Sequence, residues 1–122
     1  MRVFKIKSFA RFARKEGISD TKLADALLEI ENGLNVVDLG SGLVKKRVAR
    51  AGGGKREGYR TVIAYREGIR SVFLYGFPKN EKANLSELEL DTLKRLAKIH
   101  LRLSDADMDK ALKDGEIMEV IL

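Results

Sequence analysis

Basic residues are concentrated in the middle of this 122-residue chain. Residues 43–60 contain seven lysines and arginines but only one acidic residue, Glu57; the cations are Lys45, Lys46, Arg47, Arg50, Lys55, Arg56 and Arg60. A surface of one charge sign attracts polyanions, and clustered cations can also stabilise negative charge that develops on a phosphate group. The pattern therefore predicts a polyanionic partner and favours nucleic acid.

The sequence disfavours several other kinds of site. The chain has no cysteine, which excludes disulfides, thiolate zinc sites and a cysteine nucleophile, and it has a single histidine, His100. His100 falls on the apolar stripe of a predicted helix, where a packed, hydrogen-bonded role is expected. Asp105, Asp107 and Asp109 are interpreted as a helix cap and a solvated face. We expect neither a metal nor a cofactor.

The stretch "AGGGKREGYR", residues 51–60, contains three consecutive glycines. A nucleotide-binding phosphate loop needs GxxxxGK followed by Ser or Thr and then a helix, because the helix end helps to hold the phosphate. Here Lys55 is followed by Arg56, and a predicted strand follows. We interpret the stretch as a glycine-hinged connection between two basic strands, with Lys55 and Arg56 at its tip and Arg60 at its base.

Turn formers and apolar periodicity predict one α+β domain over residues 1–122. The expected strands are Arg2–Ile6, Val44–Arg50, Tyr59–Arg66 and Ser71–Gly76, and the last three should form an antiparallel meander. Helix starts are predicted at four serines that can act as N-caps: Ser8, Ser19, Ser86 and Ser104. The final "EIMEVIL" suggests a strand or an extended tail. No apolar run is long enough for a membrane span, which favours a cytoplasmic protein.

Alternation along the second strand separates its side chains into two faces. If Val44 and Val48 point to the core, Lys45 and Arg47 point to the opposite face. Arg60 begins the next strand beside the same rim. Phe73 is expected in the core, whereas Tyr75 and Phe77 are candidates for stacking an unpaired base.

The combination "VKKRVAR…GGGK…GYRTVIAYREG…VFLYGFPKNEKANLS" resembles the RelE/ParE superfamily of bacterial toxins and is most similar to its HigB-like branch. The resemblance is specific from Lys45 to Ser86. It implies a small antiparallel sheet packed against an N-terminal helical hairpin, with C-terminal helices over about residues 85–122. It also implies metal-independent cleavage of messenger RNA on the ribosome, in which the ribose 2′-OH attacks the neighbouring phosphate.

The resemblance also implies roles for particular residues. Arg60 matches an arginine that contacts the scissile phosphate, and Lys46 and Arg47 lie near catalytic cations of the preceding strand, to within one residue of register. Lys79 and Lys82 fall where the family carries an arginine. Further RNA contacts are expected from Lys45, Lys55, Arg56, Tyr75, Phe77 and Lys82. The family's stacking tyrosine is absent, since its nearest match is Leu85, so Tyr75 or Phe77 would replace it.

The implied partners are a cognate antitoxin, expected to be a helix-turn-helix DNA-binding protein, together with the ribosome and mRNA. Two alternatives stay open. A ParE-like toxin would inhibit DNA gyrase, although the cations of residues 43–60 count against it. A non-enzymatic module would bind RNA in a salt-dependent manner without cleaving it.

Overall fold

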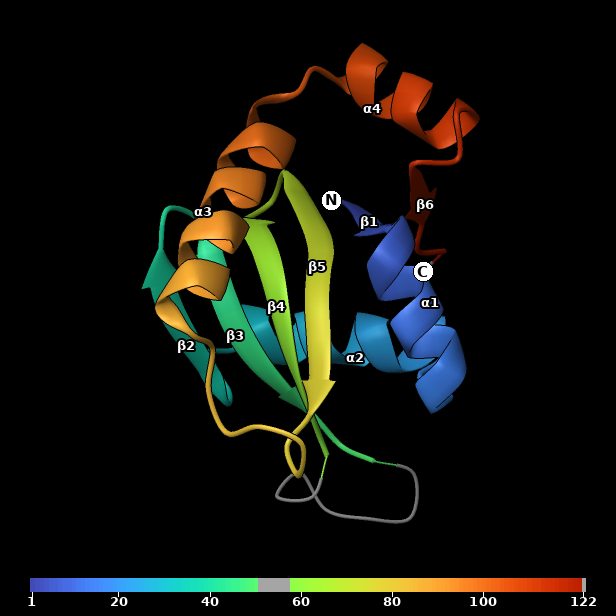
Figure 1. Ribbon diagram of the computed structural model, residues 1–122. Coiled ribbons are helices and arrows are strands. Elements are labelled where there is room, and N and C mark those ends of the chain that lie inside the picture. The colour runs from blue at the N-terminus through green and yellow to red at the C-terminus, as the bar shows by residue number, and fades with distance from the viewer. Residues whose placement is uncertain (51–57, 122) are drawn as a thin grey trace.

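The computed structural model describes residues 1–50 and 58–121. These residues form four helices and six strands. Figure 1 shows their arrangement. In chain order they are β1 (Arg2–Ile6), α1 (Lys7–Glu16), α2 (Asp20–Glu31), β2 (Val36–Gly40), β3 (Leu43–Val48), β4 (Tyr59–Arg66), β5 (Arg70–Pro78), α3 (Glu87–Arg102), α4 (Asp105–Lys113) and β6 (Ile117–Glu119).

All six strands belong to one sheet with the order β2-β3-β4-β5-β1-β6. Strands β2 to β5 form an antiparallel meander, which confirms the predicted pairing of the three central strands. Strand β1 is parallel to β5 and antiparallel to β6, a parallel pairing that the sequence did not indicate. The predicted α+β class is therefore correct, and the C-terminal segment is a strand rather than a tail.

Two local features differ from the sequence predictions. Strand β2 was not predicted; its five residues are stabilised by pairing with β3, and a short edge strand has little pattern of its own. Ser8 does not cap a helix, because β1 runs directly into α1 and Ile6 occupies the cap position without a side-chain hydrogen bond. The caps at Ser19, Ser86 and Ser104 are confirmed by side-chain oxygens that accept backbone N–H groups.

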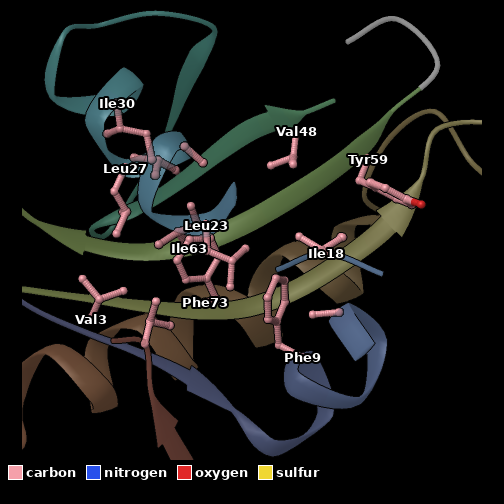
Figure 2. Close-up of a cluster of buried hydrophobic side chains, with 14 residues drawn as sticks. Val3, Phe9, Ile18, Leu23, Leu27, Ile30, Val48, Tyr59, Ile63 and Phe73 are labelled. Carbon is pink, nitrogen blue, oxygen red and sulfur yellow. The ribbon is translucent and has the colours of Figure 1, made fainter. Parts of the chain in front are cut away.

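Helices cover both faces of the sheet. Helices α1 and α2 pack on one face, where Phe9 and Leu23 meet Ile63 and Phe73 in a buried cluster (Figure 2). On the other face, a second cluster joins strand residues such as Val62 to Leu93 of α3 and to buried residues of α4 and β6. No described helix is long and apolar enough to cross a membrane.

Helix α3 covers only part of its face. The helix lies across the region where β4 ends and β5 begins, while the opposite ends of β3, β4 and β5 extend beyond it (Figure 1). This part of the sheet is bordered by the segment before α3, which contributes Ala83 and Asn84 to a pocket there.

Candidate functional site

Strand register brings the predicted cations and aromatics onto one face. Arg47 of β3 pairs with Arg60 of β4, which in turn pairs with Phe77 of β5. Cross-strand partners share a face of the sheet, so these three side chains form one row. A second row on the same face consists of Lys45, Val62 and Tyr75, taken in the same strand order. Cations therefore lie over β3 and β4, and aromatic rings lie over β5.

The cationic side of these rows borders a pocket of about 330 Å³, called the basic pocket below. It is lined by Asn35, Val36, Val37, Lys45, Arg47, Arg60, Ala83 and Asn84. Three strands and the segment before α3 thus supply its walls. Its three charged residues are all cationic, so it is suited to an anion.

Arg60 is the most unusual residue of the basic pocket. Its side chain is only 6% exposed, and its Nη1 atom has no hydrogen-bond partner among the described residues. Burial, reinforced by the nearby charge of Arg47, lowers the pKa of the Arg60 guanidinium. A buried guanidinium with an unused donor is costly, and a phosphate oxygen would satisfy it.

Lys46 lies on the opposite face of the sheet. Its side chain is fully buried against α2, where Nζ donates to Glu29 Oε1 at 2.6 Å. Its neighbour Thr61 is also buried and donates to the Lys46 carbonyl oxygen at 2.9 Å. Of the two registers that the sequence left open, the structure places Lys45 and Arg47 at the pocket and separates Lys46 from it.

Close packing explains the glycines of the Gly58-Tyr59-Arg60 and Tyr75-Gly76-Phe77 segments. A Cβ atom on Gly58 would lie 2.1 Å from the Val48 carbonyl oxygen, and one on Gly76 would lie 2.3 Å from Phe12 Cε2. The Phe12 ring meets Tyr59 edge-on at 5.8 Å between centroids. The Phe12 contacts lie on the face of the sheet that α1 covers, opposite the face from which Arg60 and Phe77 emerge.

Tyr75 and Phe77, called the aromatic pair below, carry a lysine over their rings. The ring centroids are 5.7 Å apart, and Lys82 Nζ lies 5.0 Å from each centroid. Lys82 also donates to Glu89 Oε2 at the start of α3. The structure thus brings together these three residues, which the sequence analysis assigned to RNA binding, and adds Glu89.

The remaining predicted residues lie elsewhere. Lys79 follows β5, and its backbone N–H donates to the Gly58 carbonyl oxygen at 3.2 Å; its side chain does not line the basic pocket. Lys55 and Arg56 fall outside the described residues. His100 makes the expected hydrogen bond, between Nδ1 and the Leu96 carbonyl oxygen. In residues 1–50 and 58–121, no three His, Asp or Glu side chains are grouped as metal ligands.

Sequence reasoning missed three residues at this surface. Asn35 and Asn84 line the basic pocket, and Glu89 anchors Lys82. Glu89 was visible only as the last residue of the Ser86 capping box, and nothing local linked it to Lys82. Asn35 adopts φ +52, a left-handed conformation that asparagine tolerates better than most residues, and it immediately precedes the unpredicted strand β2.

Comparison with known proteins identifies the family of the chain. No curated protein matches the chain. A family model described as the RelE toxin of the RelE/RelB toxin–antitoxin system matches residues 1–120. That match covers nearly the whole chain, including both helical layers and every strand that supplies the basic pocket. The chain therefore belongs to the RelE family, the toxins of toxin–antitoxin systems, and a cognate antitoxin is its expected partner.

Proposed function

We propose that this toxin cleaves messenger RNA on the ribosome and that the basic pocket binds the scissile phosphate. The observation that carries the proposal is the buried Arg60 guanidinium, whose Nη1 has no partner among the described residues and which lies beside Arg47. An anion that enters the pocket could accept hydrogen bonds from two guanidinium groups, which lie on adjacent strands. Guanidinium groups suit this task because their paired N–H donors match phosphate oxygens.

The proposed reaction is an internal transesterification. The ribose 2′-OH gives up its proton, its oxygen attacks phosphorus, and the bond from phosphorus to the 5′-oxygen breaks. The 5′-oxygen takes up a proton, so the products are a 2′,3′-cyclic phosphate and a 5′-hydroxyl. Arg60 and Arg47 stabilise the additional negative charge of the phosphorane, the type of stabilisation that supplies much of the catalysis in such sites.

Lysines are the proposed proton carriers. Lys45 lies one row along from Arg47 on the same face and lines the pocket, so its neutral amine form is placed to accept the 2′-OH proton and becomes the ammonium. Lys79 follows β5 next to Gly58 and lies outside the pocket lining; it is the proposed donor to the leaving 5′-oxygen once its side chain turns toward the bound RNA. Lys46 takes no part in this scheme, because its ammonium is buried on the other face against Glu29.

The test is cleavage of a reporter mRNA in a translating extract, with the ends of the products analysed chemically. Wild-type protein should produce 2′,3′-cyclic phosphate ends, and Arg60→Ala should reduce the rate by about 10²–10³-fold, as expected for loss of one stabilising donor. Arg66→Ala is the matched control, since Arg66 is an exposed arginine at the other end of β4. Equal activity of Arg60→Ala and wild type would refute the proposal. Inhibition of gyrase supercoiling without RNA cleavage would do so too.

We further propose a HigB-like toxin in the cytoplasm, paired with a helix-turn-helix antitoxin. The assignment to this branch is supported by the sequence "YGFPKNEKANLS", residues 75–86, which contains the aromatic pair and Lys82. The neighbouring reading frame provides the test. A small adjacent gene for a helix-turn-helix protein that neutralises the toxin on co-expression is expected, whereas an antitoxin of another DNA-binding class would argue against this branch.

A further inference from the structure

Lys82 covers the aromatic pair in the free protein. Its ammonium lies 5.0 Å from both ring centroids, close enough for a favourable cation–π interaction with each ring. Phe77 is only 4% exposed, and Tyr75 is partly buried. A nucleobase therefore cannot stack across the two rings while Lys82 stays in this position.

Glu89 holds Lys82 in place. Its Oε2 accepts from Lys82 Nζ and, at 3.1 Å, from the Tyr75 hydroxyl, while Oε1 accepts from the Ser86 backbone N–H at 2.9 Å. The contact with Lys82 and the hydrogen bond from Ser86 lower the pKa of Glu89 to about 2. The carboxylate is therefore ionised at neutral pH, and it offers Lys82 the kind of anionic oxygen that an RNA phosphate would also offer.

The sheet places the aromatic pair at a distance from the basic pocket that one RNA strand can span with a base and a phosphate. Lys45 and Tyr75 are separated by two strand spacings, which corresponds to roughly 10 Å between their backbones. The rows that contain Tyr75 and Phe77 follow one another along the strands by two residues, or about 7 Å. A single RNA strand can thus run along β3 and β4 with its phosphates on the cations while its bases point toward β5.

We propose that Glu89 controls access to the aromatic pair, the expected base-stacking surface, by holding Lys82 over the rings. This inference rests on the proposed RNA substrate. When RNA binds, Lys82 exchanges the Glu89 carboxylate for an RNA phosphate, and a base takes its place on the aromatic pair. Glu89 is a positioning residue in this scheme: it acts through Lys82 and does not touch the reacting atoms.

The experiment compares Glu89→Gln with Glu87→Gln. Both variants remove one negative charge from the first turn of α3, and Glu87 makes no contact with Lys82 among those resolved in the described residues. Glutamine at position 89 can still accept the Ser86 N–H, so the capping box is retained. Long-range electrostatic effects are therefore matched, and the difference between the two variants reports the release of Lys82.

The probe is a short 2′-O-methyl oligoribonucleotide that carries 2-aminopurine, which lacks the attacking hydroxyl and is not cleaved. Glu89→Gln should bind it more tightly than Glu87→Gln and quench its fluorescence more strongly. The slope of log K against log salt concentration should be equal for these two variants, because Lys82 contacts one phosphate in both complexes and only the cost of releasing it from Glu89 differs. Adding Lys82→Met to Glu89→Gln should make the slope shallower by about 0.7, the value for one phosphate contact on a single strand. Urea unfolding should show that all variants are folded.

Equal affinity and equal quenching for Glu89→Gln and Glu87→Gln would overturn the inference. Absence of oligonucleotide binding by every variant would overturn it as well, because Glu89→Gln is expected to bind more tightly. Neither outcome decides the proposed cleavage activity. That activity is measured separately, in the translating extract with Arg60→Ala.

Discussion

Replacing Arg60 by methionine should stabilise the fold while it reduces activity. Methionine keeps an unbranched stem of similar length in the same 6% exposed position but removes the charge. It therefore relieves two costs of the free protein: a buried donor with no partner among the described residues, and repulsion from Arg47. Most substitutions at buried positions destabilise, so the expected sign is opposite to the usual one.

The magnitude follows from the unpaired Nη1 atom. A buried polar group without a partner costs about 1–3 kcal/mol, and more when it is charged. A gain of about 2 kcal/mol in the free energy of unfolding would raise the urea midpoint by about 1 M, given a typical slope of about 2 kcal/mol/M for a small protein. Cleavage should fall by about 10²–10³-fold, because one stabilising donor to the phosphorane is lost.

The assay is equilibrium unfolding in urea for wild type, Arg60→Met and Arg66→Met, with and without inorganic phosphate. Arg66 is exposed on the same strand, and its variant should stay within about 0.5 kcal/mol of wild type. Phosphate should stabilise wild type and Arg66→Met more than Arg60→Met. A ligand stabilises the native state that binds it, and Arg60→Met lacks one of the guanidinium groups of the basic pocket. An unchanged or lowered urea midpoint for Arg60→Met would refute the reasoning that the buried Arg60 guanidinium destabilises the free protein and that a bound anion offsets this destabilisation.

Three further outcomes follow from the same contacts. Wild type should lose stability relative to Glu89→Gln as the pH falls. The pKa of Glu89 is about 2 in the folded protein against an ordinary 4.5, so the stability contributed by its carboxylate is complete above pH 4.5 and is lost toward pH 2. Urea midpoints measured across this pH range check the prediction. Glu29→Ala should cost more stability than Lys46→Met. The first variant leaves the fully buried Lys46 ammonium without this carboxylate, at a cost of about 3–5 kcal/mol, whereas the Glu29 side chain is 32% exposed and can reach water in the second. The reverse order of stability in urea unfolding would contradict this. Gly76→Ala should lower the thermal midpoint through a loss of about 1–3 kcal/mol, since its Cβ would overlap the Phe12 ring; a thermal melt like that of wild type would show that the ring moves at little cost.

Much of the fold was readable because local signals agreed with each other. Serine caps marked the starts of α2, α3 and α4, and the apolar runs of β3, β4 and β5 marked a meander. The sequence did not indicate β2 or the position of β1 between β5 and β6. Both depend on pairing between segments that are remote or weakly patterned, and pairing energy is not visible in a strand taken alone.

The candidate site was readable in composition but not in geometry. The local excess of cations and the Gly58-Tyr59-Arg60 segment directed attention to β3 and β4, and alternation grouped Lys45 with Arg47. Glu89 could not be assigned to the same surface, because it lies on α3 and meets Lys82 only after the segment before that helix folds back over β5.

The sequence by itself determined the residue types that gather here: a cationic segment, flanking aromatics and helices with well-marked starts. Tertiary structure decided which of the cations on β3 face the basic pocket, because a shift of one residue in strand register moves every side chain to the other side of the sheet. It placed Lys46 against Glu29 and left Lys45 and Arg47 at the basic pocket. It also buried Arg60 without a partner for Nη1 among the described residues, a cost that only the packing of the surrounding strands can impose.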